Sequence, residues 1–146
     1  SDGIFVPINI EKYHWIGVFL YKKDTRVHII VLDSLNQKWP RIEPVVSQMA
    51  RILFTGITDT DITFANCPQQ TNWYDCGLHV VLFYLHLCSS HGAHLQDVAG
   101  YTTRSYYRSL SFFASPHHAA RLRQSAFAFL KEQVPDTDAP STTATC

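Results

Sequence analysis

The sequence predicts one α+β domain in which a mixed sheet is flanked by helices, and three observations favour this architecture. The chain has 146 residues, of which 46% are hydrophobic and 16% charged, a balance typical of a single compact domain. Two runs rich in β-branched and aromatic residues, 13–21 and 27–33, are typical of paired strands. Two later segments, 42–53 and 77–87, have the apolar residue patterns of helices.

The two strand-like runs are separated by a short polar segment and predict a hairpin at the centre of the sheet, because both of its faces are apolar. If the turn centres on Lys23 and Asp24, His14 and Asp33 lie directly opposite each other, within hydrogen-bonding reach. The other facing pairs of that register are Leu20 with Val27, Val18 with Ile29, and Ile16 with Val31. A turn centred on Asp24 and Thr25 would make the His14 and Asp33 pair diagonal but keep both side chains on one face.

A loop through Trp39 follows the hairpin, and then apolar residues recur at helical spacing. The apolar positions of this predicted amphipathic helix are Ile42, Val45, Val46, Met49, Ile52 and Leu53. Pro44 fits such a helix only in its first turn. We expect Gly56 and the polar segment 59–61 to break the chain after it, and 62–65 to form a short strand.

A polar loop, 68–72, leads into the most apolar stretch of the chain. Residues 77–87 are apolar on nearly every side and predict a buried helix, whose first turn begins at Asp75 and Cys76. Residues 119–133 predict a terminal helix.

Charge and hydropathy exclude several classes of protein. The 12 Lys and Arg residues equal the 12 Asp and Glu residues, so the chain lacks the net positive charge that drives binding to nucleic acids or anionic lipid. It has neither an apolar run of the roughly 18 to 20 residues that cross a bilayer nor a signal-like start. We expect an intracellular protein, nuclear or cytoplasmic, that is a monomer and binds neither nucleic acid nor membrane. Met49 is the only Met, so we expect the sequence to be part of a longer one.

Four cysteines are present, Cys67, Cys76, Cys88 and Cys146. Without secretory features we expect free thiols, each of which could be a buried small residue, a metal ligand or a nucleophile. Cys67, Cys76 and His79 lack the paired Cys-x₂-Cys units of zinc sites, so we expect no metal.

Cys76 has the position expected of a nucleophile. The N-terminus of a helix stabilises a thiolate through unpaired backbone N–H groups and the positive end of the helix dipole. In such a site an imidazole takes the thiol proton, and a carboxylate behind the ring fixes its tautomer, which are the roles open to His14 and Asp33. A side-chain amide from Gln69 or Gln70 could stabilise the oxyanion together with the Cys76 N–H.

These residues also carry a family resemblance. The string Pro68-Gln69-Gln70-Thr71-Asn72-Trp73-Tyr74-Asp75-Cys76-Gly77, with His14-Trp15 and Asp33-Ser34 before it, resembles the Ulp/SENP family of ubiquitin-like-protein proteases. The order His, Asp, Gln, Cys and the intervals between these residues also fit the family. The resemblance implies that His14 is the general base, Asp33 the orienting acid, Gln70 the oxyanion-hole glutamine and Cys76 the nucleophile. It also implies that Trp15 binds substrate, as part of the narrow tunnel that holds the substrate's Gly-Gly terminus.

The resemblance covers roughly residues 5 to 90 and implies a papain-like or adenain-like cysteine protease core. The implied activity is cleavage after the C-terminal Gly-Gly of a SUMO-like modifier, in deconjugation and in precursor processing, without a cofactor. The implied partners are SUMO-like or other ubiquitin-like modifiers and their conjugates. We expect a catalytic domain at 1–133 that lacks the family's N-terminal part, followed by a disordered tail at 134–146. One departure is Trp73, which stands where the family usually has Gly.

Other interpretations stay open on the sequence alone. Asp33 could be a turn-capping residue, and Gln69 could replace Gln70 as the oxyanion donor. The same catalytic order occurs in YopJ-like acetyltransferases, which the chain also resembles in this respect. A third possibility is an inactive, protease-derived binding module or fragment.

Overall fold

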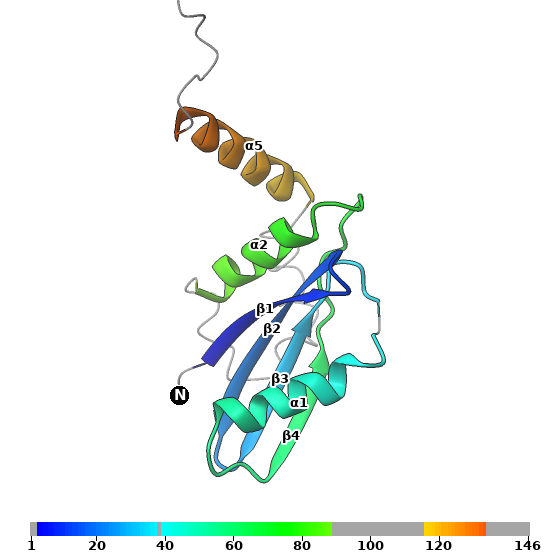
Figure 1. Ribbon diagram of the computed structural model, residues 1–146, viewed down its shortest axis with the longest axis vertical. Helices are drawn as coiled ribbons and strands as arrows, with labels where there is room; N and C mark the ends of the chain where they lie inside the picture. Colours follow the sequence, from blue (N-terminus) through cyan, green and yellow to red (C-terminus); the bar gives the residue numbers. More distant parts are fainter. Residues whose placement is uncertain (1–2, 38, 89–115, 134–146) are drawn as a thin grey trace, which may run out of the picture.

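The computed structural model describes residues 3–37, 39–88 and 116–133. In chain order its elements are the strands β1 (Gly3–Ile10), β2 (His14–Lys23) and β3 (Arg26–Leu32), the helix α1 (Ile42–Leu53), the strand β4 (Asp59–Phe64), and the helices α2 (Cys76–Cys88) and α5 (Pro116–Gln133). The four described strands form one sheet in the order β1-β2-β3-β4. β1, β2 and β3 are antiparallel neighbours and β4 runs parallel to β3, so the sheet is mixed. The predicted α+β architecture is confirmed (Figure 1).

The predicted hairpin forms the two central strands, but its first predicted register is wrong. The turn lies on Asp24 and Thr25, and β2 pairs with β3 as Val18 with Val31 and Leu20 with Ile29. Asp24 adopts a left-handed backbone with φ of 56°, which Asp tolerates better than most residues and which lets the chain reverse there. The alternative register is therefore the observed one.

One strand was not predicted, and another begins earlier than predicted. β1 was not predicted, although Ile4, Val6 and Ile8 alternate as in a strand, and it contains Pro7, which is unusual within strands. Pro7 is tolerated since β1 pairs only with β2 in the described sheet and its other edge needs no N–H from Pro7. β4 begins at Asp59, within the segment expected to break the chain, because its backbone pairs with β3 while its acidic side chains face outward.

The connection between β1 and β2 is a tight turn directly before His14. Glu11 and Lys12 both adopt positive φ, 51° and 69°, and Tyr13 N donates to Ile10 O at 3.1 Å. These are the features of a type I′ turn, which favours Asn and Gly over Glu and Lys. Residues with side chains are therefore strained at the entry to β2.

Lys12→Gly should raise the free energy of unfolding by about 0.5 to 1 kcal/mol, because Gly adopts this backbone without steric cost. Lys23→Gly is the matched control. Lys23 is also exposed but lies in β2 without positive φ, so the same change should lower the free energy by about 0.5 to 1 kcal/mol. Urea unfolding of both variants measures this, and destabilisation by Lys12→Gly would contradict it.

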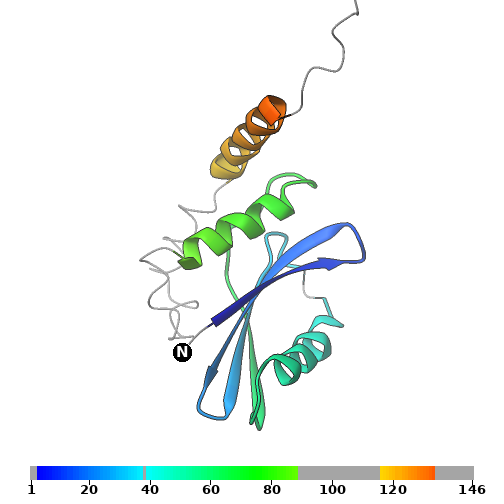
Figure 2. The same cartoon turned by 60° about the vertical axis from the view of Figure 1, so that its left-hand side comes forward.

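The helices cover opposite faces of the sheet, as Figure 2 shows for α1 and α2. α1 buries Ile42, Val46 and Ala50 against one face, whose buried strand residues are Ile16, Val18, Leu20, Val27, Ile29 and Val31. The buried face of α1 is narrower than predicted, because its Val45, Ile52 and Leu53 are exposed. Pro44 lies in the first turn of α1, as predicted.

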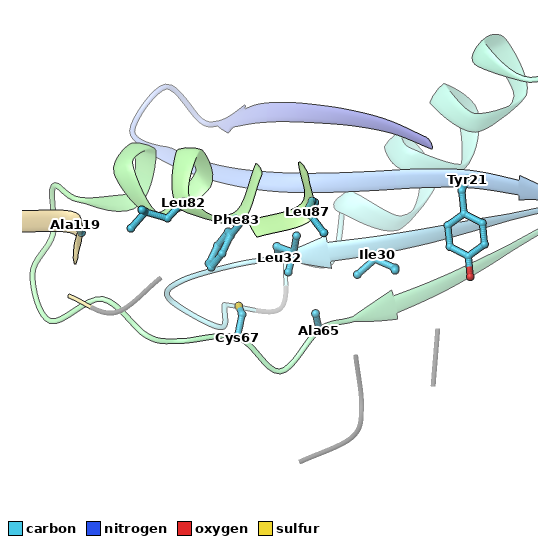
Figure 3. Close-up of a cluster of buried hydrophobic side chains, with 9 residues drawn as sticks. All are labelled: Tyr21, Ile30, Leu32, Ala65, Cys67, Leu82, Phe83, Leu87 and Ala119. Carbon is cyan, nitrogen blue, oxygen red and sulfur yellow. The ribbon is translucent and has the colours of Figure 1, made fainter. Parts of the chain in front are cut away.

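α2 packs on the other face and begins at Cys76, where the sequence predicts it. Its Leu82, Phe83 and Leu87 join Ile30 and Leu32 of β3 in a second buried cluster (Figure 3). Three further apolar residues of α2 are exposed in the described structure, so this helix is less enclosed than predicted: Val81, Tyr84 and Leu85.

α5 contributes Ala119 and the partly buried Leu122 to the α2 cluster and begins three residues before its predicted start, at Pro116. Because the exposed residues Phe127 and Phe129 lie further along, the first half of α5 makes these contacts. The predicted tail at 134–146 lies outside the described residues. None of the described helices is both long and apolar enough to cross a membrane.

Candidate active site

Cys76 is the first residue of α2 and is 5% exposed. The His79 N–H donates to Asp75 O at 2.9 Å, which closes the first turn around it. The thiol therefore lies where unpaired backbone N–H groups and the helix dipole favour a negative charge.

Two other cysteines in the described part of the chain differ from Cys76 in their surroundings. Cys67 is buried and its Sγ donates to Asp33 O at 3.0 Å. Burial raises the pKa of the Cys67 thiol to about 12, so this thiol stays neutral near pH 7. Cys88 is exposed at the far end of α2. Cys76 alone among these three combines a free thiol with a helix N-terminus.

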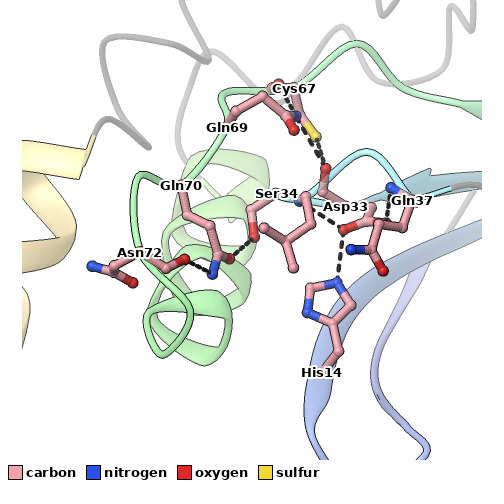
Figure 4. A network of polar contacts seen from close by, with 9 residues as sticks. His14, Asp33, Ser34, Gln37, Cys67, Gln69, Gln70 and Asn72 are labelled. Atoms are coloured by element: carbon pink, nitrogen blue, oxygen red, sulfur yellow. Dashed lines mark hydrogen bonds and ion pairs between the residues drawn. The ribbon is translucent and has the colours of Figure 1, made fainter.

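His14 and Asp33 form a buried pair. His14 Nε2 lies 2.8 Å from Asp33 Oδ1, and the two side chains are 1% and 8% exposed (Figure 4). A carboxylate only accepts, so Nε2 carries the donated hydrogen and Nδ1 is left as the proton acceptor of the neutral ring. The same carboxylate accepts Leu35 N and Gln37 N, both at 2.9 Å. Asp33 therefore both caps the loop after β3 and orients the imidazole.

The diagonal register makes this pair possible without direct opposition. His14 begins β2 and Asp33 follows the end of β3 on the same face, so the two side chains reach each other along the end of the hairpin. The sequence prediction of contact is confirmed, and its predicted facing geometry is wrong.

Trp39, predicted only as part of a loop, lies beside the candidate site. Its ring stacks on that of His14, with centroids 6.0 Å apart and an interplanar angle of 27°. Tyr13 meets the same indole edge-on at 6.2 Å. Trp39 thus shields one face of the imidazole from water. No sequence spacing predicts that an aromatic residue in a loop contacts the end of a strand. The only signal for the contact between Trp39 and His14 was an apolar residue shortly after Asp33.

The Gln70 amide is held in one orientation. Its Oε1 accepts the Ser34 hydroxyl at 2.5 Å and its Nε2 donates to Asn72 O at 2.6 Å (Figure 4). Its backbone N–H donates to Ser34 O at 2.9 Å. Because a carbonyl oxygen can only accept, the Asn72 contact fixes which end of the amide is nitrogen. Among the described contacts, that bond uses one of the two Nε2 hydrogens.

Gln69, the competing candidate, has its amide directed at the protein backbone. Its Nε2 donates to Cys67 O at 2.9 Å and to Asp33 O at 3.3 Å. This geometry favours Gln70 as the donor to an oxyanion, a role that stays a prediction.

Trp15 links the strand that carries His14 to the helix that carries Cys76. The indole is 41% exposed, and its Cδ1 lies 3.8 Å from where a Cβ on Gly77 would be. The start of β2 therefore lies beside the start of α2. No hydrogen bond joins Cys76 to His14, both of which the structure describes, and such contacts in proteases are often loose before substrate binds.

Asn72 shapes the backbone between Gln70 and Cys76. Its Oδ1 accepts Tyr74 N at 3.1 Å and Asp75 N at 2.9 Å. Trp73, in the position that is usually Gly in the resembled family, is 84% exposed and has no positive φ. This position therefore does not need the conformational freedom of Gly, and a large side chain fits without backbone strain.

Within the described ranges, no group of three or more His, Cys, Asp or Glu residues is placed to hold a metal ion. The described site contains a thiol at a helix N-terminus, an imidazole paired with a carboxylate, and a side-chain amide held in one orientation.

Comparison with known proteins gives consistent results. Residues 1–106 match the Ulp1 protease family, C-terminal catalytic domain. The curated protein "Ubiquitin-like-specific protease 1" of Saccharomyces cerevisiae is 33% identical over 88 residues, which are 56% of this chain and 14% of that protein.

Solved structures are similar as well. A crystal structure of a de-sumoylating protease matches with a TM-score of 0.56 at 20% identity, over 90% of this chain and 60% of that one. The C-terminal Ulp1 protease domain in complex with Smt3, the yeast orthologue of SUMO, matches with a TM-score of 0.43 at 30% identity, over 58% of this chain and 40% of that one. The first of these likenesses bears on the fold. The chain thus spans only part of each relative.

Proposed function

Because the chain belongs to the Ulp1 protease family, matched in its C-terminal catalytic domain, we propose that it is a cysteine protease that cleaves after the C-terminal Gly-Gly of a SUMO-like modifier. The observation that carries this proposal is the buried His14 and Asp33 pair, 2.8 Å apart, at the end of the strand that lies beside Cys76 and its helix. Each residue type needed for thiol catalysis is present in that small region.

The proposed reaction begins with transfer of the Cys76 proton to His14 Nδ1. The thiolate attacks the carbonyl carbon of the terminal Gly, and the oxyanion accepts hydrogen bonds from Gln70 Nε2 and the Cys76 backbone N–H. His14 then protonates the leaving amine, and a thioester forms on Cys76. Water activated by His14 hydrolyses the thioester and returns the thiol.

Trp15 is proposed to select the Gly-Gly terminus. Its half-exposed indole packs beside Gly77, so it forms a flat apolar wall next to the nucleophile. Two residues without side chains can lie against such a wall, whereas larger side chains would collide with it.

The class of modifier is inferred from the relatives. The curated relative is named as specific for ubiquitin-like proteins, and the solved neighbour as a de-sumoylating protease. An isopeptide bond to Lys and the peptide bond of a precursor tail present the same acyl group to Cys76. We therefore propose both deconjugation and precursor processing.

Incubation with a panel of ubiquitin-like modifiers that end in a C-terminal vinyl sulfone tests the proposal. We expect a covalent adduct with a SUMO-like modifier, mapped by peptide mass spectrometry to Cys76 and not to the exposed Cys88 or the neutral Cys67. A folded protein that forms no adduct with any modifier would overturn the protease proposal. An adduct with another modifier would change only the substrate class.

Gln70→Ala should lower kcat by about 10²- to 10³-fold with little change in KM, because an oxyanion donor acts mainly in the transition state. Gln69→Ala is the matched control, and its kcat should fall by no more than about fivefold, since it loses only hydrogen bonds within the protein. Steady-state cleavage of a fluorogenic modifier measures both. Equal effects of the two variants would remove Gln70 from its proposed role.

A further inference from the structure

Asp75, the residue before Cys76, carries a buried carboxylate. The side chain is 4% exposed, and its Oδ2 accepts Asn72 Nδ2 at 2.7 Å and Arg123 Nη2 at 3.0 Å. Arg123 comes from α5 and also lies over the Tyr74 ring, with its guanidinium carbon 5.1 Å from the ring centroid. One arginine of α5 thus contacts two consecutive residues of the loop that leads to the thiol.

This pair differs from an ordinary surface ion pair. Arg26 and Asp59 lie 3.1 Å apart, but their side chains are 54% and 58% exposed, so solvent screens them. In the Arg123 and Asp75 pair the acid is enclosed and the base is 33% exposed. Asp75 Oδ1 is buried without a hydrogen-bond partner, and Arg123 is the one cation paired with this carboxylate in the described structure. A buried carboxylate that loses its counter-charge is strongly unfavourable.

The position of the carboxylate makes its charge relevant to chemistry. The carboxylate places a negative charge one residue from the Cys76 thiol, and Arg123 offsets that charge. The Asp75 contact also anchors the loop geometrically. From Asp75, hydrogen bonds lead through Asn72, Gln70 and Ser34 to the backbone next to Asp33, and Figure 4 shows the part from Asn72 to His14.

We propose that Arg123 is a positioning residue of the active site, which acts through Asp75 to hold the loop that places Gln70 and Cys76. The inference rests on the proposed thiol chemistry. It assigns a role to α5 beyond the packing of Ala119 and Leu122 on the buried cluster that α2 shares.

Arg123→Met and Arg123→Lys test the proposal, with Arg26→Met as the matched control. We expect Arg123→Met to lower kcat for modifier cleavage by at least about tenfold while KM changes by less than about threefold. Arg123→Lys retains the charge and should recover most of the loss. Arg26→Met should retain the kcat and KM of the unchanged protein.

Alkylation of Cys76 by iodoacetamide, followed by peptide mass spectrometry, needs no modifier and separates this inference from the proposed function. The alkylation rate should fall in Arg123→Met by a factor similar to that in kcat, at a temperature where circular dichroism shows a folded protein. If the unchanged protein cleaves no modifier but alkylation of Cys76 is still slower in Arg123→Met, the proposed protease function is wrong and the role of Arg123 is retained. Unchanged alkylation in a folded Arg123→Met protein would overturn the role.

A double-mutant cycle shows whether Arg123 acts through Asp75. In an Asp75→Asn background, Arg123→Met should change alkylation by less than about threefold, because the charge that Arg123 offsets is gone. If the effects of Arg123→Met and Asp75→Asn on the alkylation rate multiply in the double variant, Arg123 does not act through Asp75. If Arg123→Met does not fold, the same cycle with Arg123→Gln, which also removes the charge, applies with the same two outcomes.

Discussion

Cys76→Ser should reduce cleavage of a SUMO-like modifier by about 10⁴-fold or more, since loss of the nucleophile removes the covalent pathway. A hydroxyl ionises far less readily than a thiol, so His14 cannot generate a comparable nucleophile from Ser. The side chains are similar in shape and the site is buried, so the fold and the binding of modifier should be retained. Cleavage kinetics and a binding titration with uncleaved modifier measure the two properties separately.

Cys88→Ser is the matched control for this change. It replaces an exposed thiol at the other end of the same helix, and full activity is expected. A Cys76→Ser protein that retains a substantial part of its turnover, or a Cys88→Ser protein that loses it, would assign the nucleophile elsewhere.

Asp33→Asn should lower kcat by about 10⁴-fold, the size of effect seen when a triad carboxylate becomes an amide. The carboxylate accepts three described hydrogen bonds, from His14 Nε2, Leu35 N and Gln37 N. The amide of Asn has one acceptor oxygen in place of two. If that oxygen takes the position of Oδ1, the NH₂ group faces the Gln37 N–H, and two donors meet. The other orientation directs the NH₂ at His14 and favours the wrong tautomer of the ring.

The same change should lower stability by about 1 to 3 kcal/mol, because at least one buried donor loses its charged acceptor. Asp24→Asn is the matched control: Asp24 is exposed in a turn with positive φ that suits Asn, so neither kcat nor stability should fall. Steady-state kinetics below the melting temperature separate the two effects. Wild-type turnover in Asp33→Asn would exclude Asp33 from the site.

Local patterns predicted most of the fold. The hairpin, the helix over 42–53 and the helix that begins at Cys76 follow from residue spacing, which is a property of short segments. The hairpin register depended on which of two turns the chain adopts. One turn centres on Lys23 and Asp24 and the other on Asp24 and Thr25. The sequence alone did not decide between them, and the structure has the second.

The elements that were missed depend on non-local pairing. β1 contains Pro7, and its pairing with β2 outweighs the local preference of that residue. Asp59 and Asp61 are unfavourable in a strand, yet β4 includes both because β3 supplies a parallel partner. Tertiary pairing overrides propensity in both cases.

The candidate site shows the same division. His14, Asp33, Gln70 and Cys76 could be identified from residue types, their order and a family resemblance, and the structure brings His14 and Asp33 into contact. Their roles in catalysis stay predictions. Trp39 and Arg123 could not be identified, because stacking across a strand end and an ion pair between a loop and α5 follow no sequence spacing.

The contact between Arg123 and Asp75 also bears on how the site is assembled during synthesis. Strands β1 to β3 and the His14 and Asp33 pair involve residues that leave the ribosome early, whereas Arg123 is made much later. Until then the nascent chain holds the Asp75 carboxylate without this partner. The loop before Cys76 should therefore become fully ordered only after Arg123 has left the ribosome and α5 has formed.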